Sequence, residues 1–198
     1  MKAKLKIKTG FFPLLLSLTL ILTKPNYFPA LFLSVFIHEL GHLLGAKLCR
    51  VTIKELKLGI FGAGLSPKDA LISYKKEIVL CLLGPLANFL SILIAHMIIP
   101  RSLLANEFFS NFLMSSLALG MLNLLPVESF DGGRILSSVL HMIFSVRLCE
   151  ILCKLISFIF IFLLWSLSVY LLIKVGASLT LFVFSASTFA KIFIPDAL

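Results

Sequence analysis

Long apolar runs recur along the whole chain and dominate its pattern. A helix that crosses the hydrocarbon core of a bilayer needs about 20 mostly apolar residues. The first run that approaches this length is short and contains Pro13, and the last is interrupted by Ser185, Ser187 and Thr188, so we expect about four to six spans. The candidate segments are 9–24, 27–48, 77–99, 107–125, 152–173 and 176–194. The pattern predicts an all-α polytopic membrane protein with about six transmembrane helices.

The segment between the second and third runs follows a different pattern. In VTIKELKLGIFGAGLSPKDALISYKK, apolar and polar residues alternate before a glycine-rich turn. Alternation with period two around such a turn is typical of a β-hairpin. We expect this short hairpin-like segment at the membrane surface, as a support or as an edge that pairs with an extended peptide. No other boundary is evident, so residues 1–198 are expected to form a single transmembrane domain.

Composition supports the membrane assignment and charge gives it a direction. The chain is 60% hydrophobic and 14% charged, with a mean hydropathy of +1.09, which exceeds what a soluble core requires. The net charge of +9 does not indicate nucleic-acid binding, because Lys and Arg lie at the ends of the apolar runs. With both termini and the hairpin in the cytoplasm, only Lys24, Arg101 and Lys174 fall on the other side. The four cysteines lack metal-site or disulfide spacing and are interpreted as buried apolar residues.

Three ionisable residues interrupt the second apolar run. The sequence FIHELGHLLGA places His38, Glu39 and His42 among Phe, Leu and Ile. Two histidines four apart share one face of a helix and can bind one zinc ion, while Glu39 beside them can act as a general base. An HExxH pattern also arises by chance, and buried histidines are often satisfied core residues. A charged group inside a membrane span is costly, however, and this favours a metal site.

A catalytic zinc ion usually has three protein ligands, so the histidine pair predicts a further ligand elsewhere. Asp131 in NLLPVESFDGGRIL follows the fourth apolar run and is expected at the depth of the histidines. Pro126 and the two glycines after Asp131 allow an irregular backbone there. His96 would lie at the wrong end of its span, whereas His141 stays a possible ligand. Asp131 could also cap the helix that follows it, a role compatible with metal binding.

Three motifs in order, HELGH, LLGPLANFL and NLLPVESFDGG, make the chain resemble the site-2 protease family of intramembrane zinc metalloproteases. The resemblance covers about Ile37 to Leu136. It implies that one zinc ion per chain is bound by both histidines and Asp131, with Glu39 as the catalytic base. It also suggests that Asn88 and Asn123 contact the substrate backbone, although each asparagine could instead form a hydrogen bond between helices.

The resemblance further implies a function in regulated intramembrane proteolysis. The expected substrate is a membrane-tethered protein, such as a transcription or sigma factor, cut within or near its transmembrane segment. Phe130 replaces the usual leucine before the DG motif, the short loop after the third run leaves no room for a PDZ domain, and the tail ending at Leu198 leaves none for a CBS domain. The chain is most similar to the sporulation-type branch, which indicates a bacterial inner membrane. A metal transporter and an inactive membrane-protein assembly factor are alternatives, and the oligomeric state is not predicted.

Overall fold

The structure is a computed structural model, and it describes most of the helical part of the chain. In the strands only the course of the backbone is described. The expected spans over 9–24 and 176–194 fall outside the described residues, apart from three positions near the C-terminus. The residues described are 4–7, 25–51, 53–59, 62–67, 72–104, 106–175, 185, 186 and 188.

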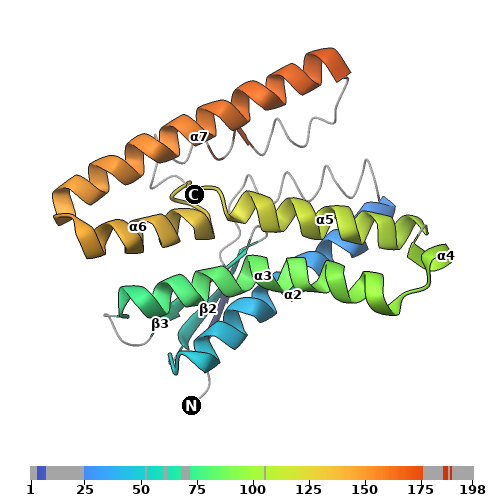
Figure 1. Ribbon diagram of the computed structural model, residues 1–198, viewed down its shortest axis with the longest axis horizontal. Helices are drawn as coiled ribbons and strands as arrows, with labels where there is room; N and C mark the ends of the chain where they lie inside the picture. The colour runs from blue at the N-terminus through green and yellow to red at the C-terminus, as the bar shows by residue number, and fades with distance from the viewer. Residues whose placement is uncertain are drawn as a thin grey trace.

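Six helices dominate the described part of the chain (Figure 1). Among the described residues, three helices are long and apolar enough to cross a membrane, spanning Phe28–Leu48, Tyr74–Ile98 and Val146–Lys174. They correspond to the second, third and fifth expected spans. The fourth expected span corresponds to the helix Glu107–Asn123, which has 17 residues. After the short helix η1 (Pro25–Tyr27), the helices are α2 (Phe28–Leu48), α3 (Tyr74–Ile98), α4 (Arg101–Leu104), α5 (Glu107–Asn123), α6 (Asp131–Ile143) and α7 (Val146–Val175).

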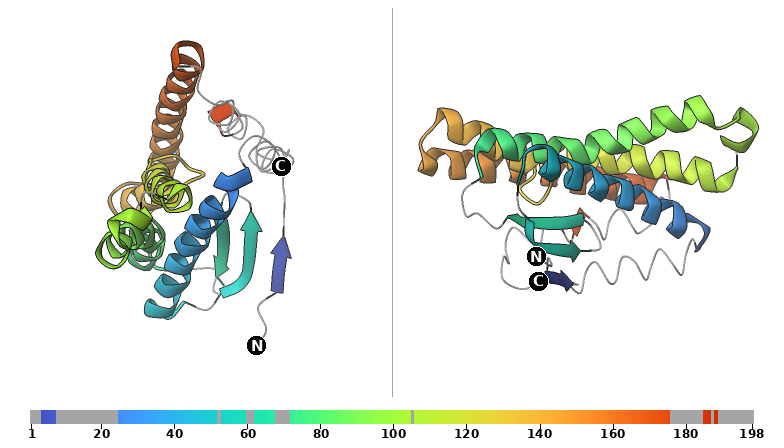
Figure 2. Two further views of the ribbon diagram at one scale, coloured as in Figure 1. Left: turned by 90° about the vertical axis from the view of Figure 1, so that its right-hand side faces the viewer. Right: turned by 90° about the horizontal axis from the view of Figure 1, so that it is seen from below.

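A three-stranded sheet lies on the side of α2 that faces away from α3 and α5 (Figure 2). The segment expected to be hairpin-like contains β2 (Ile53–Gly59) and β3 (Gly62–Pro67), which pair antiparallel. The third strand, β1 (Lys4–Ile7), pairs parallel with β2, so the strand order is β1-β2-β3. The strand β1 was not expected from the sequence, although lysines alternate with apolar residues there in the period of a strand.

The end of α2 is fixed by a Schellman motif. The amide of Val51 donates to the carbonyl of Ala46 at 2.8 Å, and the amide of Arg50 donates to that of Lys47 at 3.2 Å. Arg50 takes the left-handed conformation that this motif requires, with φ of 51°. Val51 then packs against a buried cluster that contains Ala46 and Leu80. The motif therefore joins the C-terminal end of α2 to α3.

Small residues bring α2, α3 and α5 close together. A Cβ atom at Gly41 of α2 would lie 2.8 Å from the Cβ of Ala87 on α3, so only glycine permits this approach. Two turns earlier on α2, the hydroxyls of Ser34 and of Ser116 of α5 are 2.9 Å apart and form a hydrogen bond. Small residues and hydroxyl pairs are the usual means of packing helices in a bilayer. This packing sets the position of α2 against α3, where the histidines lie.

Candidate metal centre

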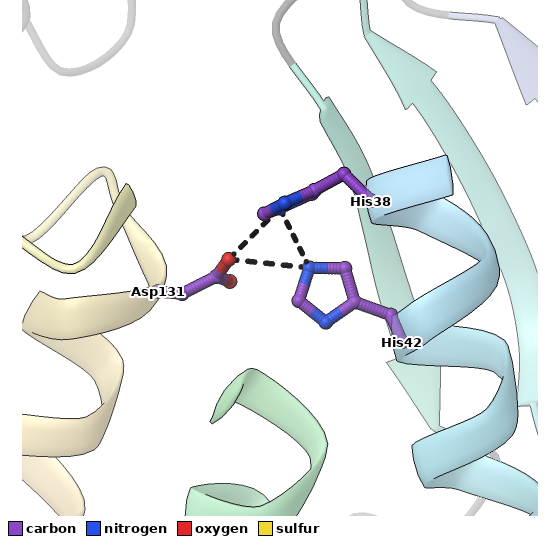
Figure 3. Close-up of side chains that lie close together, drawn as sticks. All are labelled: His38, His42 and Asp131. Atoms are coloured by element: carbon purple, nitrogen blue, oxygen red, sulfur yellow. Dashed lines mark hydrogen bonds and ion pairs between the residues drawn. The ribbon is translucent and has the colours of Figure 1, made fainter. Parts of the chain in front are cut away.

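The two histidines of α2 and the aspartate that begins α6 meet in the interior of the bundle (Figure 3). Asp131 Oδ2 lies 3.1 Å from His38 Nε2 and 3.2 Å from His42 Nε2. The two Nε2 atoms are 3.1 Å apart. Relative exposures are 3% for His38, 4% for His42 and 9% for Asp131, so three potential metal ligands are shielded from solvent together.

The imidazole rings of α2 are oriented by contacts on their opposite sides. Their planes are nearly perpendicular, at 87°. Nδ1 of His42 lies 2.9 Å from the carbonyl oxygen of Leu80, to which it donates a hydrogen bond. Nδ1 of His38 lies 3.3 Å from Nδ2 of Asn88. Both neighbours belong to α3, and both histidines therefore direct Nε2 towards Asp131.

The donor set fits a zinc ion. Two imidazoles and one carboxylate leave a fourth position open, and tetrahedral bonds of about 2.0–2.2 Å place neighbouring donors about 3.3–3.6 Å apart. The observed separations of 3.1–3.2 Å between Asp131 Oδ2 and the two Nε2 atoms, and between those two atoms, are close to this spacing. Gly84 of α3 keeps the space beside the rings open, because a Cβ there would lie 2.5 Å from His42 Nε2.

Asp131 is placed by the tight turn that precedes α6. A Cβ atom at Gly132 would lie 2.5 Å from the carbonyl oxygen of Leu125, and one at Gly133 would lie 2.7 Å from the amide nitrogen of Glu128. Only glycine allows α6 to begin this close to the turn. The turn is also attached to α7, because the amide of Glu128 donates to the Ser157 hydroxyl at 2.9 Å. The two glycines thus hold Asp131 opposite the histidines.

The remaining candidate ligands lie apart from this group. The Nδ1 atom of His96, exposed near the end of α3, lies 3.0 Å from the carbonyl oxygen of Ile92. His141 bonds to the Ser137 carbonyl at 2.7 Å and stacks on Tyr74, with ring centroids 5.6 Å apart. Among the described residues, the potential metal ligands group only as His38, His42 and Asp131.

Three further residues were expected to act at the site, namely Glu39, Asn88 and Asn123, and they lie at different positions relative to the histidines. Glu39 is partly buried and directly follows His38 in α2. Asn88 is fully buried and contacts His38. Asn123 is partly buried near the end of α5 and donates to the Leu119 carbonyl of its own helix at 3.0 Å. The structure therefore brings Asn88, but not Asn123, into contact with a histidine of the metal centre.

A polar contact that was not expected from the sequence joins α3 to α6 near Asp131. Arg134 Nη2 donates to Glu77 Oε1 at 3.1 Å, and the Ser138 hydroxyl donates to Glu77 Oε2 at 3.1 Å. From the sequence alone, Arg134 is one of the basic residues near the ends of the apolar runs, and these indicate membrane orientation. Its spacing of three residues from Asp131 places both on adjacent turns of one helix, which could have indicated a shared face.

The sequence is similar to one family of known proteins. The model of peptidase family M50 matches residues 27–103 and 101–167. A zinc metalloprotease of Methanocaldococcus jannaschii is 34% identical over 116 residues, covering 57% of this chain and 34% of that protein. Stage IV sporulation protein FB of Bacillus subtilis is 32% identical over 107 residues, covering 54% of this chain and 37% of that protein.

The overall fold is also similar to a solved structure. The solved structure of the site-2 protease from M. jannaschii superposes on this structure with a TM-score of 0.66 at 22% sequence identity. The alignment covers 100% of this chain and 94% of the solved chain. This similarity concerns the fold. The chain spans about a third of the length of the curated relatives that it matches in sequence.

Proposed function

The chain belongs to peptidase family M50, and we propose that it is an intramembrane zinc metalloprotease that hydrolyses peptide bonds of membrane-tethered proteins. The observation that carries the proposal is that His38, His42 and Asp131 lie together. His38 and Asp131 belong to different helices and are 93 residues apart in the sequence. These residues would hold one zinc ion per chain. The fourth position is left for water or substrate, as in catalytic zinc sites.

The chain's own residues supply orientation and proton transfer. When bound, a zinc ion would polarise the scissile carbonyl and lower the pKa of water. Glu39, which follows the first histidine on α2, accepts the proton of the water that attacks the carbonyl carbon. It then donates this proton to the amide nitrogen as the C–N bond breaks, so that two peptides leave. Asn123 precedes Asp131 in the same sequence motif but forms no hydrogen bond with either histidine among the described residues. We propose that it binds the substrate backbone.

The substrate must reach this site in an extended form. A peptide bond inside a helix is shielded by its own hydrogen bonds and by neighbouring side chains. We therefore propose that a transmembrane segment of the substrate unwinds as it enters the bundle. Hydrophobic side chains such as Phe32 and Met97, which are 64% and 77% exposed, indicate that the outer surface of α2 and α3 faces lipid. Substrate would approach through the bilayer.

The cellular setting follows from charge and from the relatives. The excess of Lys and Arg supports six spans with both termini and the hairpin in the cytoplasm, and cleavage near the cytoplasmic end of the substrate segment. One relative is a sporulation protein and one solved structure is a site-2 protease. On this basis we propose regulated proteolysis in a bacterial inner membrane, with release of a transcription or sigma factor, by a single transmembrane domain over residues 1–198.

Zinc content and cleavage, measured together, test the proposal. The detergent-purified protein and its Glu39→Gln variant are analysed for zinc and incubated with a tethered reporter substrate. We expect about one zinc ion per chain in both, because Glu39 is not a ligand, and cleavage only by the unchanged protein. Cleavage at the original rate by Glu39→Gln would overturn the role of Glu39. Metal without cleavage in either protein would favour transport or scaffolding, and no metal would overturn the site.

A further inference from the structure

The GPLAN segment of α3 lies against both histidines of the metal centre. Gly84 leaves room for the His42 ring, as described above. Pro85, fully buried in the helix interior, has no N–H, so the carbonyl of Cys81 has no helical amide to accept from. The carbonyl of Leu80 in the same turn accepts the hydrogen bond from His42 Nδ1. The last residue of the segment, Asn88, occupies the corresponding position beside Nδ1 of His38.

The amide of Asn88 has an orientation that matters for metal binding. Its Nδ2 lies 3.3 Å from His38 Nδ1, and its fully buried Oδ1 has no hydrogen-bond partner among the described residues. In this orientation His38 Nδ1 accepts, so the ring proton resides on Nε2, the atom that faces Asp131. The two ends of an asparagine amide have nearly the same shape, and their assignment depends on the hydrogen-bond network.

A ring proton on Nε2 of His38 would block metal binding by that atom. Rotating the Asn88 amide by a half-turn removes this obstacle. Oδ1 then faces Nδ1 of His38 and accepts its N–H, which leaves the lone pair of Nε2 available for a metal. His42 already has this arrangement, with its Nδ1 directed at the carbonyl oxygen of Leu80. Metal-binding histidines commonly donate their second N–H to such an oxygen, which fixes the tautomer and the ring orientation.

We propose that Asn88 is a positioning residue that accepts a hydrogen bond from His38 Nδ1–H and so holds Nε2 of His38 ready for zinc. Full burial and contact with a ligand distinguish this role from binding the substrate backbone. The inference rests on the proposed function, because zinc is the metal that the positioned histidine would bind. It extends that function by giving the whole GPLAN segment a role in supporting the two histidines.

Zinc affinity, rather than cleavage, is the decisive measurement. The full chain in detergent is titrated with zinc in competition with a chromophoric chelator. In Asn88→Leu no side-chain acceptor remains, and we expect zinc affinity to fall about 10- to 100-fold. In Asn88→Asp an acceptor oxygen is retained, and we expect affinity within about threefold of the original. Ser91→Ala is the control, since the Ser91 hydroxyl donates to the backbone carbonyl of Asn88 at 2.7 Å, and its removal should leave zinc affinity unchanged.

The outcomes separate this inference from the proposed function. Unchanged zinc affinity in Asn88→Leu, or an equal loss in Asn88→Leu and Asn88→Asp, would overturn the positioning role while leaving the protease proposal intact. Absence of zinc from the unchanged protein would overturn both. If the leucine variant does not fold, Asn88→Ala replaces it under the same criteria. In a His38→Ala background, Asn88→Leu should cause no further loss; an additional loss there would show that Asn88 does not act through His38.

Discussion

Gly84 of α3 faces His42 of α2 so closely that a Cβ atom at position 84 would lie 2.5 Å from Nε2 of the histidine. The same atom would lie 3.0 Å from Cε1 of His38. A methyl group there must displace at least one imidazole from its position opposite Asp131. The absence of a side chain at Gly84 is therefore a requirement of the metal centre, beyond any role in helix packing.

Gly84→Ala is accordingly expected to weaken zinc binding by tenfold or more, an effect of about 1.4 kcal/mol or greater. Alanine is the better helix former, by about 1 kcal/mol, so a loss cannot arise from helix propensity. Gly120→Ala on α5 is a matched control, because its added Cβ would meet the Phe89 ring at 3.0 Å and not the histidines. Chelator competition should show a loss in the first variant alone; equal zinc affinity in both would contradict the steric argument.

The third ligand is tested by a pair of substitutions. Asp131→Ala removes the carboxylate that lies 3.1 Å from His38 Nε2, and we expect zinc affinity to fall by tenfold or more. His141→Ala should leave zinc content unchanged, because His141 bonds to Ser137 and stacks on Tyr74 away from the histidine pair. Elemental analysis of both purified variants decides the matter. Full zinc in Asp131→Ala together with loss in His141→Ala would transfer the third position to His141.

The local parts of this site could be predicted from sequence, whereas the parts that depend on packing between helices could not. His38 and His42 are four residues apart on one helix, so their shared face follows from helix geometry. The topology predicted Asp131 as the third ligand, because the order and direction of the spans bring its turn to the membrane depth of the two histidines. The contact of Asn88 with His38 depends on the close approach of α2 and α3, which no sequence period encodes.

The same distinction holds for the fold. Apolar length predicted α2, α3 and α7 because a spanning helix needs a long run of such residues. The strand β1 was missed because its lysines were interpreted only as orientation signals, although their alternation has the period of a strand. The ion pair of Glu77 with Arg134 was missed for the same reason. Charged residues at the ends of apolar runs can thus have structural partners as well as a topological role.

Arg50 offers a test of local backbone conformation outside the site. Its φ of 51° at the end of α2 is a conformation that glycine adopts without cost. Arg50→Gly should raise the free energy of unfolding by about 0.5–1 kcal/mol, since the Schellman motif is kept and the strain of a side chain is removed. Lys47→Gly, in the last turn of the same helix, should instead lower it by about 1 kcal/mol. Thermal unfolding in detergent compares the two; a lower melting temperature for Arg50→Gly would contradict this interpretation.

Asn123 provides the contrast to Asn88. Its side chain is partly buried and its Nδ2 donates within α5, at 3.0 Å from the Leu119 carbonyl oxygen. No contact joins it to His38, His42 or Asp131 among the hydrogen bonds of the described residues. If Asn123 binds the substrate backbone, its removal should affect catalysis and leave the metal centre unchanged.

Asn123→Ala is therefore expected to retain the original zinc affinity while kcat/KM for a tethered reporter falls about tenfold, the effect of one lost hydrogen bond of about 1.4 kcal/mol to the substrate. Asn88→Leu should lose zinc affinity first, and its cleavage should recover when zinc is supplied in excess. Measuring both variants at low and saturating zinc separates the two roles, because added zinc cannot restore a substrate contact. Recovery of Asn123→Ala by excess zinc would place Asn123 in the support of the metal centre instead.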